Sequence, residues 1–145
     1  MNRLVSILLV ACTLGFMGAS PAGADGGVSS ADGLRARAVV QAQLDAFAAD
    51  DAALAFSYAA PSLREAFGSA ERFIALVRGS YAVVYRPAAV AFAAPEMAGD
   101  EIVQRVHFTD AAGSLWLATY RLQRQLDNNW RIGGCELVQS RSQAT

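Results

Sequence analysis

The sequence predicts an α+β fold in which N-terminal helices pack on a curved antiparallel sheet. Two observations favour this fold class. Between residues 101 and 139, three stretches of alternating apolar and polar residues are separated by the turn clusters Asp110–Gly113 and Asp127–Asn129. Between residues 31 and 81, apolar residues recur at helical spacing. A single sheet has to bury one face, so we expect these helices to cover it.

Four helices are expected in the first half of the chain. In Asp32–Ala49, an apolar stripe repeats at helical spacing, and Gln43 lies at its edge, where it can point into the space between helix and sheet. The stripe consists of Ala36, Val40, Leu44 and Phe47. The other helices are Ala52–Tyr58 capped by the Asp50-Asp51 pair, Ser62–Phe67 with Ser62 and Glu65 as a capping box, and Ala70–Arg78 capped by Ser69.

The second half of the chain predicts strands. Pro87 places the β-prone segment Val83–Arg86 at a sheet edge or a bend, Ala88–Ala93 forms a short strand, and Pro95–Asp100 is a loop. Three longer strands follow, Glu101–Thr109, Ser114–Gln125 and Trp130–Gln139. Alternation puts one set of side chains on the face toward the helices. This set comprises Ile102, Gln104, Val106, Phe108, Trp116, Ala118, Tyr120, Leu122, Trp130 and Ile132.

The pair Gly133-Gly134 interrupts the last strand and favours a β-bulge. With a bulge, Cys135 and Leu137 continue the buried face and Glu136 points to water. Without one, Glu136 points inward and its pKa is raised by desolvation. We favour the bulge, because an uncompensated buried carboxylate is costly.

The first 24 residues have the pattern of a secretory signal peptide. Arg3 precedes the apolar run Leu4–Met17, and Ala22-Gly23-Ala24 is a small-residue cleavage site. We therefore expect cleavage after Ala24 and a periplasmic or secreted protein, with a flexible lead-in (25–30), one domain (31–140) and a C-terminal tail (141–145). A lipobox at Leu9–Cys12, which would lipidate Cys12, is the alternative.

Composition argues against several functions. The formal net charge is -1 and charges of both signs are scattered, so we expect neither nucleic acid nor, after cleavage, a membrane as a partner. All 12 basic residues are arginine, which excludes a Schiff-base or P-loop lysine. The single histidine, His107, is expected on the solvent face beside Arg105. No catalytic residue, metal site or cofactor is predicted, because nucleophile, dinucleotide and metal-ligand spacings are missing from the sequence.

Several blocks of the chain together resemble a known family. They are Gln43–Asp51, Ala55–Pro61, Phe67–Phe73, Tyr85-Arg86-Pro87 and Trp130-Arg131-Ile132. They are similar to an exported bacterial family catalogued as domain of unknown function 4864, over about Ala38 to Gln139. The order of elements resembles the nuclear-transport-factor-2-like fold, a cone whose sheet wraps a long N-terminal helix. The resemblance implies no reaction.

Three functions follow from these observations. The first is a non-catalytic module that binds a small ligand between the first helix and the sheet. Its pocket candidates are Gln43, Tyr81, Gln104, Trp116, Tyr120 and Glu136. The second is a homodimer or partner-binding scaffold that uses the outer sheet face at Leu115 and Leu117. The third is a small-molecule isomerase or hydrolase with Glu136 and Tyr120, which requires an inward Glu136.

Overall fold

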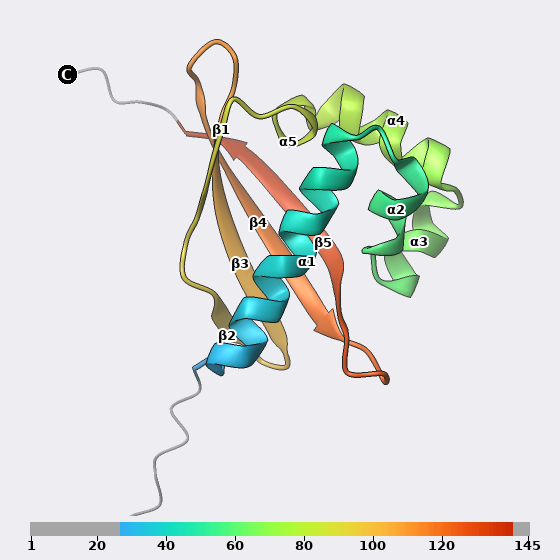
Figure 1. Cartoon of the computed structure of the whole chain (residues 1–145), viewed down its shortest axis with the longest axis vertical. Coiled ribbons are helices and arrows are strands. Elements are labelled where there is room, and N and C mark those ends of the chain that lie inside the picture. The colour runs from blue at the N-terminus through green and yellow to red at the C-terminus, as the bar shows by residue number, and fades with distance from the viewer. Residues whose placement is uncertain (1–26, 141–145) are drawn as a thin grey trace, which may run out of the picture.

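The computed structural model describes residues 27–140, which form one layer of helices against one sheet. Figure 1 shows α1 lying across one face of the sheet, with α2, α3 and α4 grouped beyond one side of it. The helices are α1 (Ser30–Ala48), α2 (Ala52–Ser57), α3 (Pro61–Phe67), α4 (Ala70–Ser80) and α5 (Ala82–Tyr85). The strands are β1 (Ala89–Phe92), β2 (Glu96–Ala98), β3 (Glu101–Thr109), β4 (Leu115–Arg124) and β5 (Trp130–Gln139). The predicted α+β class is confirmed. Within the described residues, no helix is long and apolar enough to cross a membrane.

The sheet is antiparallel with strand order β1-β3-β4-β5, and β2 pairs with β3 beside β1. The three long strands match their predicted ranges closely, because alternation and turn residues agree there. The assigned inner face is also correct: Ile102, Val106 and Phe108 of β3 are buried. They are joined by Ala118, Tyr120 and Leu122 of β4.

The prediction that Val83–Arg86 lies at a sheet edge or a bend is wrong. This segment belongs to the short helix α5. The backbone N–H groups of Tyr85 and Arg86 donate to the carbonyls of Tyr81 and Ala82 at 3.1 and 3.0 Å. Three consecutive side chains, Val83 to Tyr85, are buried, which one face of a strand does not allow. Tertiary packing here overrides the β-propensity of the sequence.

The stretch Pro95–Asp100, predicted as a loop, contains β2. Glu96 to Ala98 pairs with the start of β3, and the two strands are joined by Gly99-Asp100. Gly99 has a φ of 65°, a left-handed conformation that glycine adopts without steric strain. The prediction failed because three residues are too few to show alternation.

Helix α1 carries the stripe that the sequence predicts. Ala36, Val40, Leu44 and Phe47 are buried and belong to the same core cluster as Tyr120. The helix begins at the N-cap Ser29, whose hydroxyl accepts from the Asp32 N–H at 3.1 Å.

The start of α1 is tied to the sheet through Asp32. Its carboxylate accepts from Trp130 Nε1 at 3.2 Å and pairs with Arg124, whose guanidinium lies over the Trp130 ring. The hydrogen bond from Trp130 lowers the pKa of Asp32, and the contacts of Ser29 and Arg124 act in the same direction. These contacts join residues almost a hundred positions apart in the sequence.

The end of α1 is tied to α4 and α5 through Asp50. This residue has a φ of 56° and closes a Schellman motif, in which the Asp51 N–H donates to Ala46 O at 2.9 Å. Arg78 and Arg86 donate to the two Asp50 carboxylate oxygens at 3.1 and 3.0 Å. Both guanidinium groups also lie over the Tyr85 ring.

The caps of the short helices follow the prediction in two cases. Asp51 caps α2 and Ser69 caps α4, each accepting from the backbone N–H three residues on. The capping box at Ser62 is wrong, because α3 begins at Pro61 and its N-cap is Ala60. The N–H of Ala60 donates to Ile132 O at 2.7 Å, so pairing with β5 fixes the start of the helix one residue earlier.

We predict that Asp51→Ala lowers the free energy of unfolding by about 1 kcal/mol, because it leaves an N-terminal N–H of α2 without a partner. Ser62→Ala is the matched control. It should change that free energy by less than about 0.5 kcal/mol, since the exposed Ser62 caps nothing. Urea unfolding followed by circular dichroism measures both, and equal losses would contradict the assignment of the caps.

Candidate functional site

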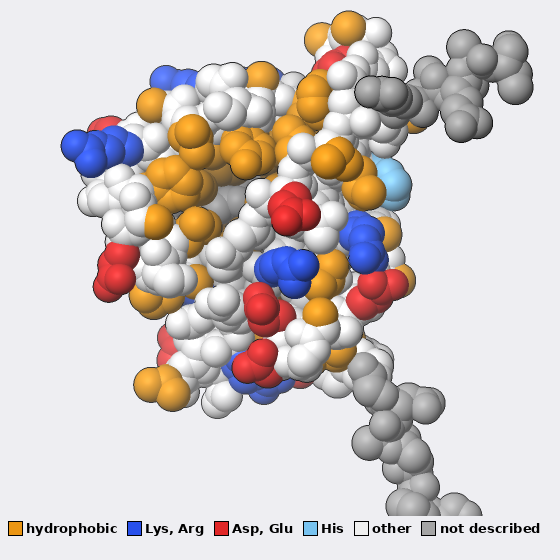
Figure 2. All heavy atoms as spheres, turned by 180° about the vertical axis from the view of Figure 1, so that it is seen from behind, with side chains coloured by type: hydrophobic (Ala, Val, Ile, Leu, Met, Phe, Trp, Pro, Cys, Tyr) orange, Lys and Arg blue, Asp and Glu red, His pale blue; other side chains and the backbone are white. Residues whose placement is uncertain are grey.

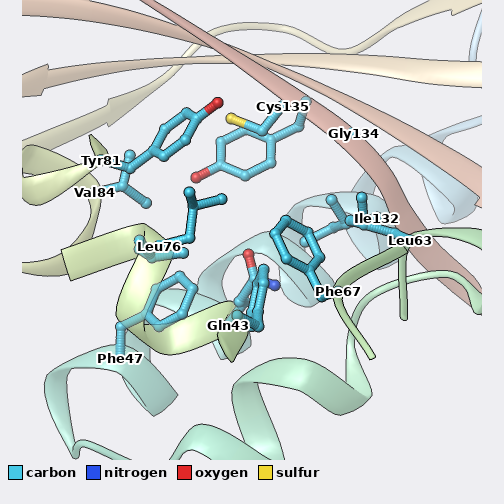
Figure 3. A pocket seen from close by; sticks show the side chains of 13 residues that line it. Gln43, Phe47, Leu63, Phe67, Leu76, Tyr81, Val84, Ile132, Gly134 and Cys135 are labelled. Carbon is cyan, nitrogen blue, oxygen red and sulfur yellow. The ribbon is translucent and has the colours of Figure 1, made fainter. Parts of the chain in front are cut away.

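A cavity of ≈ 230 Å³ lies between β5, the start of α5 and the helices α1, α3 and α4. Figure 2 shows hydrophobic side chains gathered around a hollow on the face opposite the view of Figure 1. Figure 3 shows the side chains that line it. They are Gln43, Phe47, Leu63, Phe67, Phe73, Leu76, Val77, Tyr81, Val84, Tyr120, Ile132, Gly134 and Cys135. The lining is therefore mainly apolar.

A β-bulge shapes the wall that β5 contributes. Ile132 lies opposite Leu122 and Gly134 lies opposite Arg121, so Gly133 is the extra residue. The predicted bulge is confirmed. After it, Cys135 lines the cavity and Glu136 is exposed.

The position of Glu136 removes the isomerase or hydrolase hypothesis. That hypothesis requires the carboxylate to point inward beside Tyr120, and the bulge turns it to solvent. Glu136 is also missing from the cavity lining.

Gln43 gives the cavity its clearest polar group. The side chain is 3% exposed, and Nε2 donates to Ala55 O at 3.1 Å. This bond fixes the orientation of the amide, and Figure 3 shows its oxygen pointing toward the space between Leu76 and Phe67. The cavity therefore offers a hydrogen-bond acceptor that is held in place by α2.

Tyr120 and Cys135 lie opposite each other on β4 and β5. Tyr120 is 1% exposed, and its hydroxyl lies near the Cys135 thiol but has no partner at ordinary hydrogen-bond geometry among the described residues. Burial raises the pKa of Tyr120 well above its ordinary value and raises the pKa of Cys135 to about 12. Both groups are therefore neutral near pH 7, and the thiol is not activated as a nucleophile.

The cavity brings together three of the six residues singled out from the sequence: Gln43, Tyr81 and Tyr120. Gln104 is fully buried elsewhere, where its amide donates to Ala93 O at 2.7 Å and its oxygen lacks a partner in the described part of the chain. Trp116 donates to Asp110 at 2.9 Å, in the turn between β3 and β4.

Half of the other lining residues come from α3 and α4. Phe73 packs against Phe47 and Phe67, with ring centroids 5.8 and 5.2 Å apart. Phe73 and Val77 are buried, and helical periodicity is identical for a residue in solid core and for one that lines a cavity. No sequence signal separated these two environments.

The outer face of the sheet exposes both apolar and polar side chains to solvent. Leu115 is 50% exposed, and Leu117 lies between His107 and Val138 in the strand register. The histidine is exposed, as its position on the polar face predicts. In residues 27–140, no three His, Cys, Asp or Glu side chains are grouped so that they could hold a metal ion.

Fold and site together define a small α+β domain with an apolar cavity at the edge of its sheet. Residues 29–145 match the family described as a domain of unknown function (DUF4864), and the chain belongs to this family. Comparisons with curated proteins and with solved structures each gave no significant match.

We predict that Tyr120→Phe raises the free energy of unfolding by about 1 kcal/mol, because it removes a buried hydroxyl that lacks a partner. Tyr81→Phe, whose ring lines the same cavity but is only half-buried, should leave stability within about 0.5 kcal/mol. Thermal and urea unfolding measure both. A clear loss of stability in Tyr120→Phe would show that this hydroxyl is hydrogen-bonded in solution.

Proposed function

We propose that this protein is a non-catalytic module that binds a small, largely apolar ligand in the cavity beside β5. The observation that carries the proposal is the contrast between the apolar lining and two buried polar groups on it. The Gln43 oxygen faces the cavity, and the buried Tyr120 hydroxyl has no hydrogen-bond partner within residues 27–140. A few convergent polar groups in an apolar pocket are the usual composition of a small-molecule site.

The volume of the cavity limits the size of the ligand. At ≈ 230 Å³ it falls below the range of roughly 300–1,000 Å³ that is usual for drug-sized ligands. The occupant is accordingly a small ring or a short branched chain. Gln43 uses its Nε2 on Ala55 and offers an acceptor, so a ligand with one hydrogen-bond donor is favoured.

The chemistry of the lining supports binding without reaction. Among the described residues, the lining contains no carboxylate and no histidine, and its ionisable groups are one thiol and two phenols. A general acid or base near neutral pH requires a group whose pKa lies close to 7. Burial moves the pKa values of Cys135 and Tyr120 away from that range.

The proposal includes the fold family and the compartment expected from the sequence. A helix-first chain whose antiparallel sheet packs on a 19-residue α1 supports a nuclear-transport-factor-2-like cone. The pattern of Arg3, the apolar run Leu4–Met17 and Ala22–Ala24 supports export, although these residues lie outside the described part of the structure.

We predict that indole, a small ring with one N–H donor, binds the cavity with a Kd in the roughly micromolar to millimolar range. Leu76→Trp, on the cavity rim, should weaken binding at least tenfold by filling the space. Leu54→Trp is the matched control, because this leucine is similarly exposed on α2 and does not line the cavity. Titration followed by NMR chemical shifts measures both, and equal binding by the two variants would place indole elsewhere.

We further predict that the exported protein begins at Asp25. Expression of the full chain in a bacterial host, followed by fractionation and N-terminal sequencing, checks this. A lipidated N-terminus at Cys12 would instead support the lipobox, and an intact N-terminus in the cytoplasm would contradict export.

A further inference from the structure

Strand β5 is an edge strand whose outer side is paired only at its beginning. The N–H of Ile132 donates to Tyr58 O at 2.8 Å, and Ile132 O accepts from Ala60 at 2.7 Å. These bonds form a single parallel bridge between the α2–α3 connection and β5. Beyond Ile132, this side of β5 forms no backbone hydrogen bond with any other segment in residues 27–140.

The register identifies the backbone groups that are free. In an antiparallel ladder, the N–H and C=O of one residue point to the same neighbour, and successive residues alternate. The backbone N–H and C=O of Ile132 point away from β4. The backbone groups of Leu122, which lies opposite, therefore point away from β5. Tyr120 and Ala118 are two and four residues from Leu122 on β4, so their backbone groups also point away from β5.

Cys135 and Leu137 lie opposite Tyr120 and Ala118, so their N–H and C=O groups point outward. The hydrogen bond from Ser140 N to Leu115 O agrees with this assignment. Ser140 is an odd number of residues from Cys135 and Leu137, and its N–H points toward β4. Gln139 lies opposite Trp116 and alternates in the same way, so within residues 27–140 three donors and three acceptors are free at this edge.

These free groups adjoin the cavity. Cys135 lines it, and Leu137 packs against the core cluster on the same face of β5. Figure 3 shows Cys135 and Gly134 on one side of the hollow and Leu76 and Tyr81 across from them. A strand placed beside β5 would carry alternate side chains on this face, directly at the hollow.

One feature that normally hinders strand addition is present in β5, the bulge at Gly133, and it lies before the free part of the strand. Edge strands are usually short, or carry proline or several charges. The free part of β5, Gly134–Gln139, contains no proline and one charged residue, Glu136. The groups offered repeat at strand spacing, and a peptide backbone is the ligand that complements such a row.

We propose that the free half of β5 binds an extended peptide segment by strand addition, with one apolar side chain of that peptide in the cavity. The inference rests on the proposed function, since the cavity is its anchor site, and it names the ligand class. The peptide continues along β5 from the point where Tyr58–Ala60 leaves it. The cavity volume suits a single large apolar side chain.

The probe is the blocked peptide acetyl-Thr-Lys-Thr-Phe-Thr-Lys-Thr-amide, in which phenylalanine shares one face with no other large apolar residue. We expect a Kd below about 1 mM by calorimetry, and slowed hydrogen exchange at the amides of Cys135 and Leu137. The proposed strand runs antiparallel to β5, so the N–H of the residue opposite Cys135 points toward β5. The same peptide with an N-methylated phenylalanine keeps the ring and loses this donor. Its binding should be at least tenfold weaker, as should binding of a peptide with serine in place of phenylalanine.

Leu137→Pro tests the protein side. This N–H points outward, so proline removes it without breaking the ladder with β4, and peptide affinity should fall at least tenfold. Val90→Pro is the matched control on β1, the edge strand at the other side of the sheet. The N–H of Ala93 donates to Arg105 O of β3, so by alternation the N–H of Val90 points away from β3 and is free to be replaced. Its peptide affinity should be unchanged.

Two results would overturn the inference. Equal binding of the N-methylated and unmodified peptides, without protection of the Cys135 and Leu137 amides, would reduce the interaction to a side chain in the cavity. Absence of peptide binding while indole still binds would refute strand addition and leave the proposed function standing. The peptide and exchange measurements use the unaltered protein, so they decide the question even if Leu137→Pro fails to fold.

Discussion

The β-bulge at Gly133 is the constraint on which the candidate site depends. Before it, Trp130 and Ile132 face α1; after it, Cys135 and Leu137 take that face. A strand without the extra residue would turn Glu136 inward and fill the same space with a carboxylate that lacks a partner. A Cβ at Gly133 would lie 2.8 Å from the end of the Gln123 side chain, so a larger residue at this position would require that flexible side chain to shift.

The second requirement is that α4 and α5 do not close on the second half of β5. Contacts at both ends of α1 help to fix where these elements lie. Asp32 ties its start to Trp130, and Asp50 ties its end to Arg78 and Arg86, which flank the ring of Tyr85. Helices α4 and α5 are thereby held against the end of α1. The space between them and the second half of β5 remains as the cavity.

Alternation and turn chemistry were sufficient to predict β3, β4, β5 and the inner face of the sheet. They failed where local preference and tertiary contact disagree. The β-branched pair Val83-Val84 indicates a strand, but burial of Val83, Val84 and Tyr85 in a row favours a helix. Ser62 and Glu65 have the spacing of a capping box, but the bridge from Ala60 to Ile132 starts the helix earlier.

The candidate site was only half predictable for a related reason. A period of two assigns a side chain to a face, and it does not say which part of that face the helices cover. Gln104, Trp116 and Tyr120 were all assigned to the inner face. Gln104 is enclosed beside Ala93 and Trp116 bonds to Asp110, so only Tyr120 reaches the cavity. Gln43 was found because it lies at the edge of an otherwise apolar stripe.

The unsatisfied groups around the cavity point to one occupant rather than two. A buried hydroxyl without a partner destabilises a fold by roughly 1–3 kcal/mol, and an unprotected sheet edge invites association. Both features lie beside Cys135, whose side chain lines the cavity and whose backbone is free at the edge. A small molecule would satisfy the cavity and leave the edge open. A strand with one apolar side chain would fill the cavity and pair with the edge. Its apolar side chain would not pair with the Tyr120 hydroxyl, so the free edge is the feature that favours a strand over a small molecule.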